Sequence, residues 1–299
     1  MVTLDRPYDV HHETLWSQVA DRPHVLELPE VAGVRTRVLR VGAEHADRGT
    51  ILMLAGTTGH LEAFTHNVRA LSDHYQVLAY DYPGHGWSTL ASGALEIDDY
   101  ASHLLALVDH YGLVRPHLLG ESLGGWIALK VVPHHPDLFG AVILSAPGGR
   151  MIATDQLAGT QSVSRDAVAD PSWDNVKRRL GVVIHDPDAI SDELVAVRQA
   201  IYAQPGFPES ARAIAALRTP EVRERNAVTE ADYAAQPRPT LLVWTDHEPS
   251  GSPEVGRALA AELPDGRFVL VEGAAHWPQW EAPAQFNAAV LAFLEEVSR

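Results

Sequence analysis

HLLGESLGGWIALKVV, residues 117–132, runs from a short apolar strand into a helix through a turn that contains Ser122. Residues 120–124 match the pattern G-x-S-x-G. That pattern marks a sharp strand-to-helix turn that exposes a serine hydroxyl, and small residues must flank the serine where strand and helix approach each other. Gly120 and Gly124 supply them. Because a strand precedes the turn and a helix follows it, we interpret Ser122 as a nucleophile rather than as a helix-capping serine.

Strand and helix patterns alternate on both sides of this turn. Apolar runs such as 50–56 are continuous, which is typical of strands buried on both faces. The expected strands are 34–41, 50–56, 76–86 (a strand with its Gly/Pro turn), 117–120, 141–147, 240–245 and 267–273. The expected helices are 62–73, 97–112, 123–134, 253–262 and 281–298. This series predicts an α/β fold whose parallel sheet has right-handed crossovers.

Residues 150–236 break the alternation, because helical pieces dominate and no strand of comparable strength appears. The helical pieces are 172–180, 191–204 and 209–226. We therefore predict a core made of 1–149 and 237–299, with 150–236 inserted as a helical lid, or cap. The lid is expected over the C-terminal edge of the sheet, where ligands bind in open α/β sheets.

A serine hydroxyl needs a base to take its proton before it can attack. His276 follows the last expected strand and precedes the last expected helix, in EGAAHWPQWEAP. That is the third position in the chain order serine, acid, histidine. The acid should follow the strand 240–245, where both Asp246 and Glu248 qualify.

Two backbone amides are expected to stabilise an oxyanion beside Ser122. The amide of Leu123 lies at the start of a helix, where donors point outward. The second donor is expected from the loop LAGTTG, residues 54–59, with Thr57 as the donor. The alternative is that Thr57 and Thr58 are ordinary turn residues.

Composition excludes several classes of function. There is no cysteine, so disulfides, thiolate zinc sites and cysteine nucleophiles are excluded. A net charge of −16 argues against nucleic acid, which requires a basic surface. The N-terminus lacks a signal-peptide pattern, and no stretch approaches the roughly 20 apolar residues of a membrane span. We expect a soluble, cytoplasmic protein that binds a small-molecule substrate and neither nucleic acid nor a membrane.

The chain resembles the α/β-hydrolase superfamily and, within it, the meta-cleavage-product (carbon–carbon bond) hydrolases of aromatic catabolism. The resemblance covers about 34–298, and its most specific stretch is HWPQWE at 276–281, followed by Phe286-Asn287. The segment DELVAVR at 192–198 is similar to the lid helix of that family. The resemblance implies a mostly parallel, twisted eight-stranded sheet flanked by helices, with the lid inserted after the sixth strand.

The resemblance also bears on the triad acid. Many relatives carry a W-G-x-D pattern after the corresponding strand. Aligning Trp244 with its Trp puts Thr245 at the Gly and Glu248 at the acid, so Glu248 is the preferred acid and Asp246 the alternative. Glutamate is a known substitute for aspartate in this role.

The resemblance implies a substrate pocket as well. Arg198 matches an arginine that grips a substrate carboxylate, although a surface arginine making local ion pairs is the alternative. Trp277 matches a tryptophan beside the base. Glu121 stands where the family has Asn, and Val183 replaces a bulky aromatic residue of the lid. We add Glu121, Thr58 and Val183 to the expected substrate contacts.

The implied reaction is serine-dependent hydrolysis of a C–C bond in a 2-hydroxy-6-oxo-hexa-2,4-dienoate-like, vinylogous 1,5-diketone substrate, with no cofactor or metal. The main alternative is a carboxylesterase or lactonase with the same triad, because fold does not fix substrate. The departures at Glu121 and at Ala55, which replaces the His of the family's oxyanion loop, favour that alternative. A homodimer or higher homo-oligomer is also implied.

Overall fold

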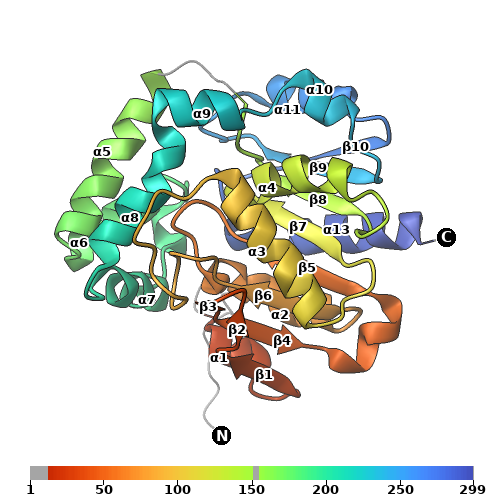
Figure 1. Cartoon of the computed structure of the whole chain (residues 1–299), viewed down its shortest axis with the longest axis horizontal. Coiled ribbons are helices and arrows are strands. Elements are labelled where there is room, and N and C mark those ends of the chain that lie inside the picture. The colour runs from red at the N-terminus through yellow and green to blue at the C-terminus, as the bar shows by residue number, and fades with distance from the viewer. Residues whose placement is uncertain (1–12, 151–154, 299) are drawn as a thin grey trace, which may run out of the picture.

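Eight strands form one sheet in the order β1-β4-β6-β5-β7-β8-β9-β10 (Figure 1). The computed structural model describes residues 13–150 and 155–298, and the side chains of 155–160 are excepted. The strands are β1 (His24–Glu27), β4 (Val38–Val41), β5 (Thr50–Leu54), β6 (Gln76–Tyr80), β7 (His117–Glu121), β8 (Val142–Ser145), β9 (Thr240–Thr245) and β10 (Gly266–Val271). The pairs β1-β4 and β4-β6 are antiparallel and the rest parallel. The predicted mostly parallel, eight-stranded sheet is confirmed.

Helices cover both faces of the sheet because its central strands are apolar on both sides. In β5, Leu52 and Leu54 enter one hydrophobic core, and Ile51 and Met53 enter the other. The helices of the first core include α3 (Ile97–His110), α4 (Leu123–Val131) and α11 (Pro253–Glu262). Those of the second are α1 (Leu15–Val19), α2 (Thr65–Ser72) and α13 (Pro283–Val297). Successive side chains of a strand point to opposite faces, so one apolar run supplies both cores.

The single strand expected at 34–41 is wrong, since the chain divides it in two. β3 (Val34–Arg35) pairs with β2 (Glu30–Val31) in a separate two-stranded sheet, and only β4 enters the main sheet. Between them, the Thr36 amide donates to the carbonyl of Pro29 and the Arg37 side chain turns toward buried carboxylates. Polar contacts distant in sequence therefore interrupt the ladder.

Two expected helices are shorter than the pattern predicts. The helix expected at 123–134 ends at Val131 and continues as a 3₁₀ turn, Val132–His134. That turn contains Pro133, which cannot donate an α-helical hydrogen bond. The helix expected at 281–298 is preceded by the separate short helix α12 (Pro278–Glu281), and α13 begins at Pro283. No helix in the described part of the chain has the length and apolar character needed to cross a membrane.

A helical segment lies between β8 and β9, after the sixth strand of the sheet in chain order. Its helices are α5 (Asp155–Ala169), α6 (Trp173–Leu180), α7 (Asp192–Tyr202), α8 (Phe207–Ala215), α9 (Pro220–Asn226) and α10 (Glu230–Ala234). Helices α5 to α8 gather to one side of the sheet in Figure 1. Their apolar side chains form a third core, which includes Trp277 and Trp280. By contrast, α10 packs on α4 and α11, and its Asp232 pairs with Lys130 at 3.0 Å.

Candidate active site

Ser122 occupies the tight turn between β7 and α4. Its φ of 50° and ψ of −105° are rarely adopted by a residue with a side chain, so the turn is strained. A Cβ at Gly120 would lie 2.5 Å from the Gly124 carbonyl carbon, and one at Gly124 would lie 2.2 Å from the Leu54 oxygen. Both positions therefore require glycine. The Ser122 amide donates to the Ser145 carbonyl at 2.9 Å, which ties the turn to β8.

His276 and Glu248 meet where the loops after β9 and β10 adjoin. His276 Nδ1 lies 2.9 and 3.0 Å from the two Glu248 carboxylate oxygens, and the Glu248 side chain is fully buried. Burial alone would raise the pKa of Glu248, but the charge and hydrogen bond of His276 outweigh it and lower that pKa. Burial alone would lower the pKa of His276, but the Glu248 and Glu121 charges raise it to about 9.

Asp246, the alternative acid, has a different set of partners. Its carboxylate accepts hydrogen bonds from the amides of Gly273, at 2.9 and 3.0 Å, and Ala274, at 3.3 Å. These contacts hold the start of the loop that carries His276. Glu248 therefore contacts His276, whereas Asp246 stabilises the loop that precedes His276.

Glu121 lies on the other side of the His276 ring. Its Oε1 is 3.3 Å from His276 Nε2, and the residue is 1% exposed. Its Oε2 lies against Gly56, where an added Cβ would approach it to 2.2 Å, and a backbone hydrogen bond from Gly56 offsets part of the effect of burial on its pKa. Burial is the main reason that the pKa of Glu121 rises to about 7. The predicted substrate contact of Glu121 stays a prediction, and the structure places this second carboxylate beside the histidine and in the cavity lining.

The loop after β5 carries Thr57 and Thr58. Thr57 lines the cavity together with Leu123, whereas Thr58 is not among the lining residues. The Tyr82 hydroxyl donates to the Ala55 carbonyl at 3.0 Å, and the Gly59 amide donates to the Gly56 carbonyl. Tyr82 thus braces the loop where the family's histidine is missing, a contact that the sequence pattern did not indicate.

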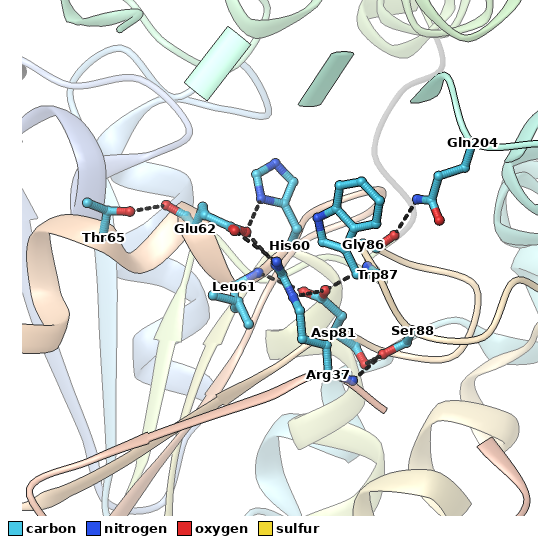
Figure 2. A network of polar contacts seen from close by, with 10 residues as sticks. All are labelled: Arg37, His60, Leu61, Glu62, Thr65, Asp81, Gly86, Trp87, Ser88 and Gln204. Carbon is cyan, nitrogen blue, oxygen red and sulfur yellow. Dashed lines mark hydrogen bonds and ion pairs between the residues drawn. The ribbon is translucent and has the colours of Figure 1, made fainter. Parts of the chain in front are cut away.

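A buried ionic network holds the far end of this loop (Figure 2). Arg37 donates to Asp81 at 2.8 Å and to both oxygens of Glu62 at 3.0 and 2.5 Å. His60 Nδ1 lies 2.8 Å from Glu62, and the Leu61 amide donates to Asp81 at 2.8 Å. Gln204, just past the end of α7, donates to the Gly86 carbonyl at 2.8 Å, close to this network. Strand β4, the Thr57 loop and the turn after β6 are thereby fixed relative to one another.

A cavity of about 190 Å³ opens beside Ser122, His276 and Glu248. Its apolar wall is formed by Trp126, Val182, Val183, Ile214, Leu217 and Trp277. Its polar lining includes Glu121 and five arginines, at 150, 179, 198, 218 and 223. Arg198 is 1% exposed, lies 5.4 Å from the Trp277 ring centre, and has Nη1 3.4 Å from the Tyr202 hydroxyl.

The structure therefore brings together the expected site residues, with Thr58 outside the cavity lining. Four of the arginines were not predicted, since nothing in a stretch such as KRRL at 177–180 distinguishes a pocket arginine from a surface one. Within residues 13–150 and 155–298, no three His, Asp or Glu side chains gather in a way that could hold a metal ion.

The sequence profile described as the alpha/beta hydrolase fold matches residues 49–283, which is most of the chain. The chain belongs to this family. This α/β hydrolase is 25% identical over 243 residues to a 2-hydroxy-6-oxononadienedioate/2-hydroxy-6-oxononatrienedioate hydrolase from a Pseudomonas species, covering 77% of this chain and 81% of that one. It is 28% identical over 271 residues to the dihydrolipoyllysine-residue acetyltransferase component of an acetoin cleaving system from Pseudomonas putida, covering 90% and 70%.

A solved structure has the same fold as this hydrolase. It is a meta-cleavage product hydrolase from Pseudomonas fluorescens IP01, with a TM-score of 0.76 and 22% identity over 89% of this chain and 96% of that one.

The pair of carboxylates around His276 predicts the pH dependence of this α/β hydrolase. Glu121→Gln removes a negative charge 3.3 Å from Nε2, which destabilises the imidazolium and lowers the pKa of His276 from about 9. The neutral base is then present at lower pH. We expect the acid limb of the rate of Ser122 labelling by a fluorophosphonate to move down by about one pH unit. Glu272→Gln, an exposed change on the same loop, should leave the limb in place. An unmoved limb in Glu121→Gln would show that Glu121 does not act on His276.

Proposed function

We propose that this α/β hydrolase is a serine-dependent enzyme that cleaves a C–C bond in a 2-hydroxy-6-oxo-hexa-2,4-dienoate-like substrate. The observation that carries the proposal is Arg198, a buried guanidinium that lines the same cavity as Ser122 and His276. Such a fork suits a substrate carboxylate. Curated relatives named as hydrolases of dienedioates, 25–27% identical over 77–83% of this chain, add support.

In the proposed mechanism, Arg198 holds the carboxylate of the ketonised substrate. Ser122, or a water activated by the same pair, attacks the distal carbonyl while His276 Nε2 takes the proton. Glu248 orients His276 and stabilises its charge. Nε2 must turn from Glu121 toward Ser122 for this step, and catalytic hydrogen bonds commonly tighten only when substrate is bound.

The amides of Leu123 and Thr57 would stabilise the oxyanion, and loss of one such donor costs about 3 kcal/mol in the barrier. The C–C bond then breaks with its electron pair on the leaving carbon, which takes the proton from His276. Water attacks the acyl group on Ser122, again with His276 as base, and releases the acid. No step uses a cofactor.

We also propose that residues 150–236 act as a lid on a core made of 1–149 and 237–299. The segment supplies Arg179, Val183 and Arg198 to the cavity, while the core supplies Ser122, Glu248 and His276. Closing the lid would exclude water from the reacting carbonyl. The bulk of the substrate would fill the space left by Val183.

The second candidate function is hydrolysis of a small ester or lactone. The carboxylate of Glu121, which lies against Gly56 of the oxyanion loop, favours it. The family has a neutral Asn at the position of Glu121, so the surroundings of the nucleophile differ in charge. The triad chemistry is the same for both candidates.

The test compares kcat/KM for a ring-fission dienoate and for p-nitrophenyl acetate. We expect the dienoate to be preferred and Arg198→Met to raise its KM by about 10- to 100-fold, as expected for a lost charge-assisted pair. The KM of the uncharged ester should rise far less. Hydrolysis of the ester alone, with equal effects of Arg198→Met on any substrate, would establish the esterase instead.

A further inference from the structure

Three arginines of the helical segment interact electrostatically with one tyrosine, Tyr202. They are Arg179 at the end of α6, Arg198 in α7 and Arg218 in the 3₁₀ turn Ala216–Arg218. All three line the cavity beside Ser122. The Tyr202 hydroxyl lies 3.4 Å from Arg198, and the charges of Arg198 and Arg179 overcome burial to lower the pKa of Tyr202.

Two of these guanidinium groups, those of Arg179 and Arg198, have buried N–H groups without a partner among the described residues. Arg179 is 6% exposed, and its Nε and Nη1 have no hydrogen-bond partner among the described residues. Nε and Nη2 of Arg198 are also buried without a hydrogen-bond partner among the described residues. Arg37, equally buried, has two carboxylates, so the chain does pair a structural arginine where it needs one.

A buried charge without a counter-charge destabilises the fold even after the surrounding protein relaxes. Burial lowers the pKa of Arg179 to about 10, which still leaves it charged at neutral pH. The chain has 39 acidic and only 23 basic residues, so carboxylates are abundant, yet the described side chains place none on Arg179. The counter-charge is therefore expected from a ligand in the cavity.

One carboxylate cannot pair with all three guanidinium groups. Since the proposed function assigns the first carboxylate to Arg198, Arg179 and Arg218 remain. We propose that Arg179 and Arg218 form a second anion subsite, so that the substrate of this site is a dicarboxylate. The apolar wall of Val182, Val183 and Ile214 suits the carbon chain between its two ends. The proposal rests on the proposed function only for the role of Arg198.

The test measures binding rather than turnover. Pimelate and heptanoate, which have seven carbons and differ by one carboxylate, compete with fluorophosphonate labelling of Ser122. We expect pimelate to protect at about 10- to 100-fold lower concentration than heptanoate, as for one added charge-assisted pair. Arg179→Met and Arg218→Met should each remove most of that advantage. Arg178→Met is the matched control, because Arg178 is adjacent and 54% exposed, and it should preserve the advantage.

A thermal unfolding series separates a ligand role from a structural one. Replacing an unpaired buried charge by an apolar side chain is neutral or stabilising. Ligand-free Arg179→Met is therefore expected to unfold at or above the wild-type Tm. A Tm several degrees lower, or equal protection by the two acids in the wild type, would overturn the subsite. If Arg179→Met loses the pimelate advantage but the wild type does not turn over a dienoate, the proposed function is wrong and the subsite stands. If the wild type turns over a dienoate but shows no pimelate advantage, the subsite is wrong and the proposed function stands.

Discussion

Glu248→Gln is expected to lower kcat by on the order of 10⁴-fold, the loss seen when the acid of such a triad becomes an amide. The Glu248 oxygens both face His276 Nδ1, and an amide there no longer stabilises the imidazolium or fixes its tautomer. Asp246→Asn is the matched change two residues away. Its remaining oxygen can still accept from the Gly273 amide, so kcat should change by about threefold or less. Both variants are assayed with the substrate that the wild type turns over best.

The ranking of these two variants is the deciding result. Asp246→Asn loosens the loop before His276, so its signature is a lower Tm with near-normal turnover. A larger loss of kcat in Asp246→Asn than in Glu248→Gln would make Asp246 the triad acid.

Ser122→Ala is expected to lower kcat by about 10⁵- to 10⁶-fold and to abolish labelling by a fluorophosphonate. Alanine keeps the turn but removes the attacking oxygen. Ser122→Gly should be equally inactive yet more stable than Ser122→Ala by about 1 kcal/mol, because glycine relieves the strain of φ 50°.

The pair of serine variants separates chemistry from folding. Unfolding midpoints measure the relief of strain, and kcat measures the loss of the nucleophile. If Ser122→Ala retained a tenth of the activity, a water activated by His276 would be the attacking group and Ser122 would not be essential.

The local sequence pattern predicted the elements whose bounds are set by an apolar run or by a proline. The strand 240–245 and the helix 253–262 have the bounds that their sequences predict. The apolar run of β9 is buried at every position, and Pro253 begins the helix. The edge strand β1 was missed because it is short and half exposed, with Leu26 57% exposed.

Contacts between distant segments explain what could not be predicted. The break at Thr36 depends on carboxylates that lie 25 and 44 residues from Arg37. The choice between Asp246 and Glu248 depends on how two loops meet, because both acids suit the linear pattern. Arg179 has a helical sequence context that is indistinguishable from a surface position, so only its burial reveals it.

The ionic network of Arg37, Glu62 and Asp81 has a consequence for anyone exchanging loops between members of this family. Its three charges come from three segments of the chain, and the Arg37 guanidinium pairs with both carboxylates, while His60 adds a contact to Glu62. A transplanted loop containing Glu62 would bury an orphaned carboxylate in any recipient that lacks an arginine at the position of Arg37. The three residues should therefore be exchanged together, and a chimaera must carry all of them or none.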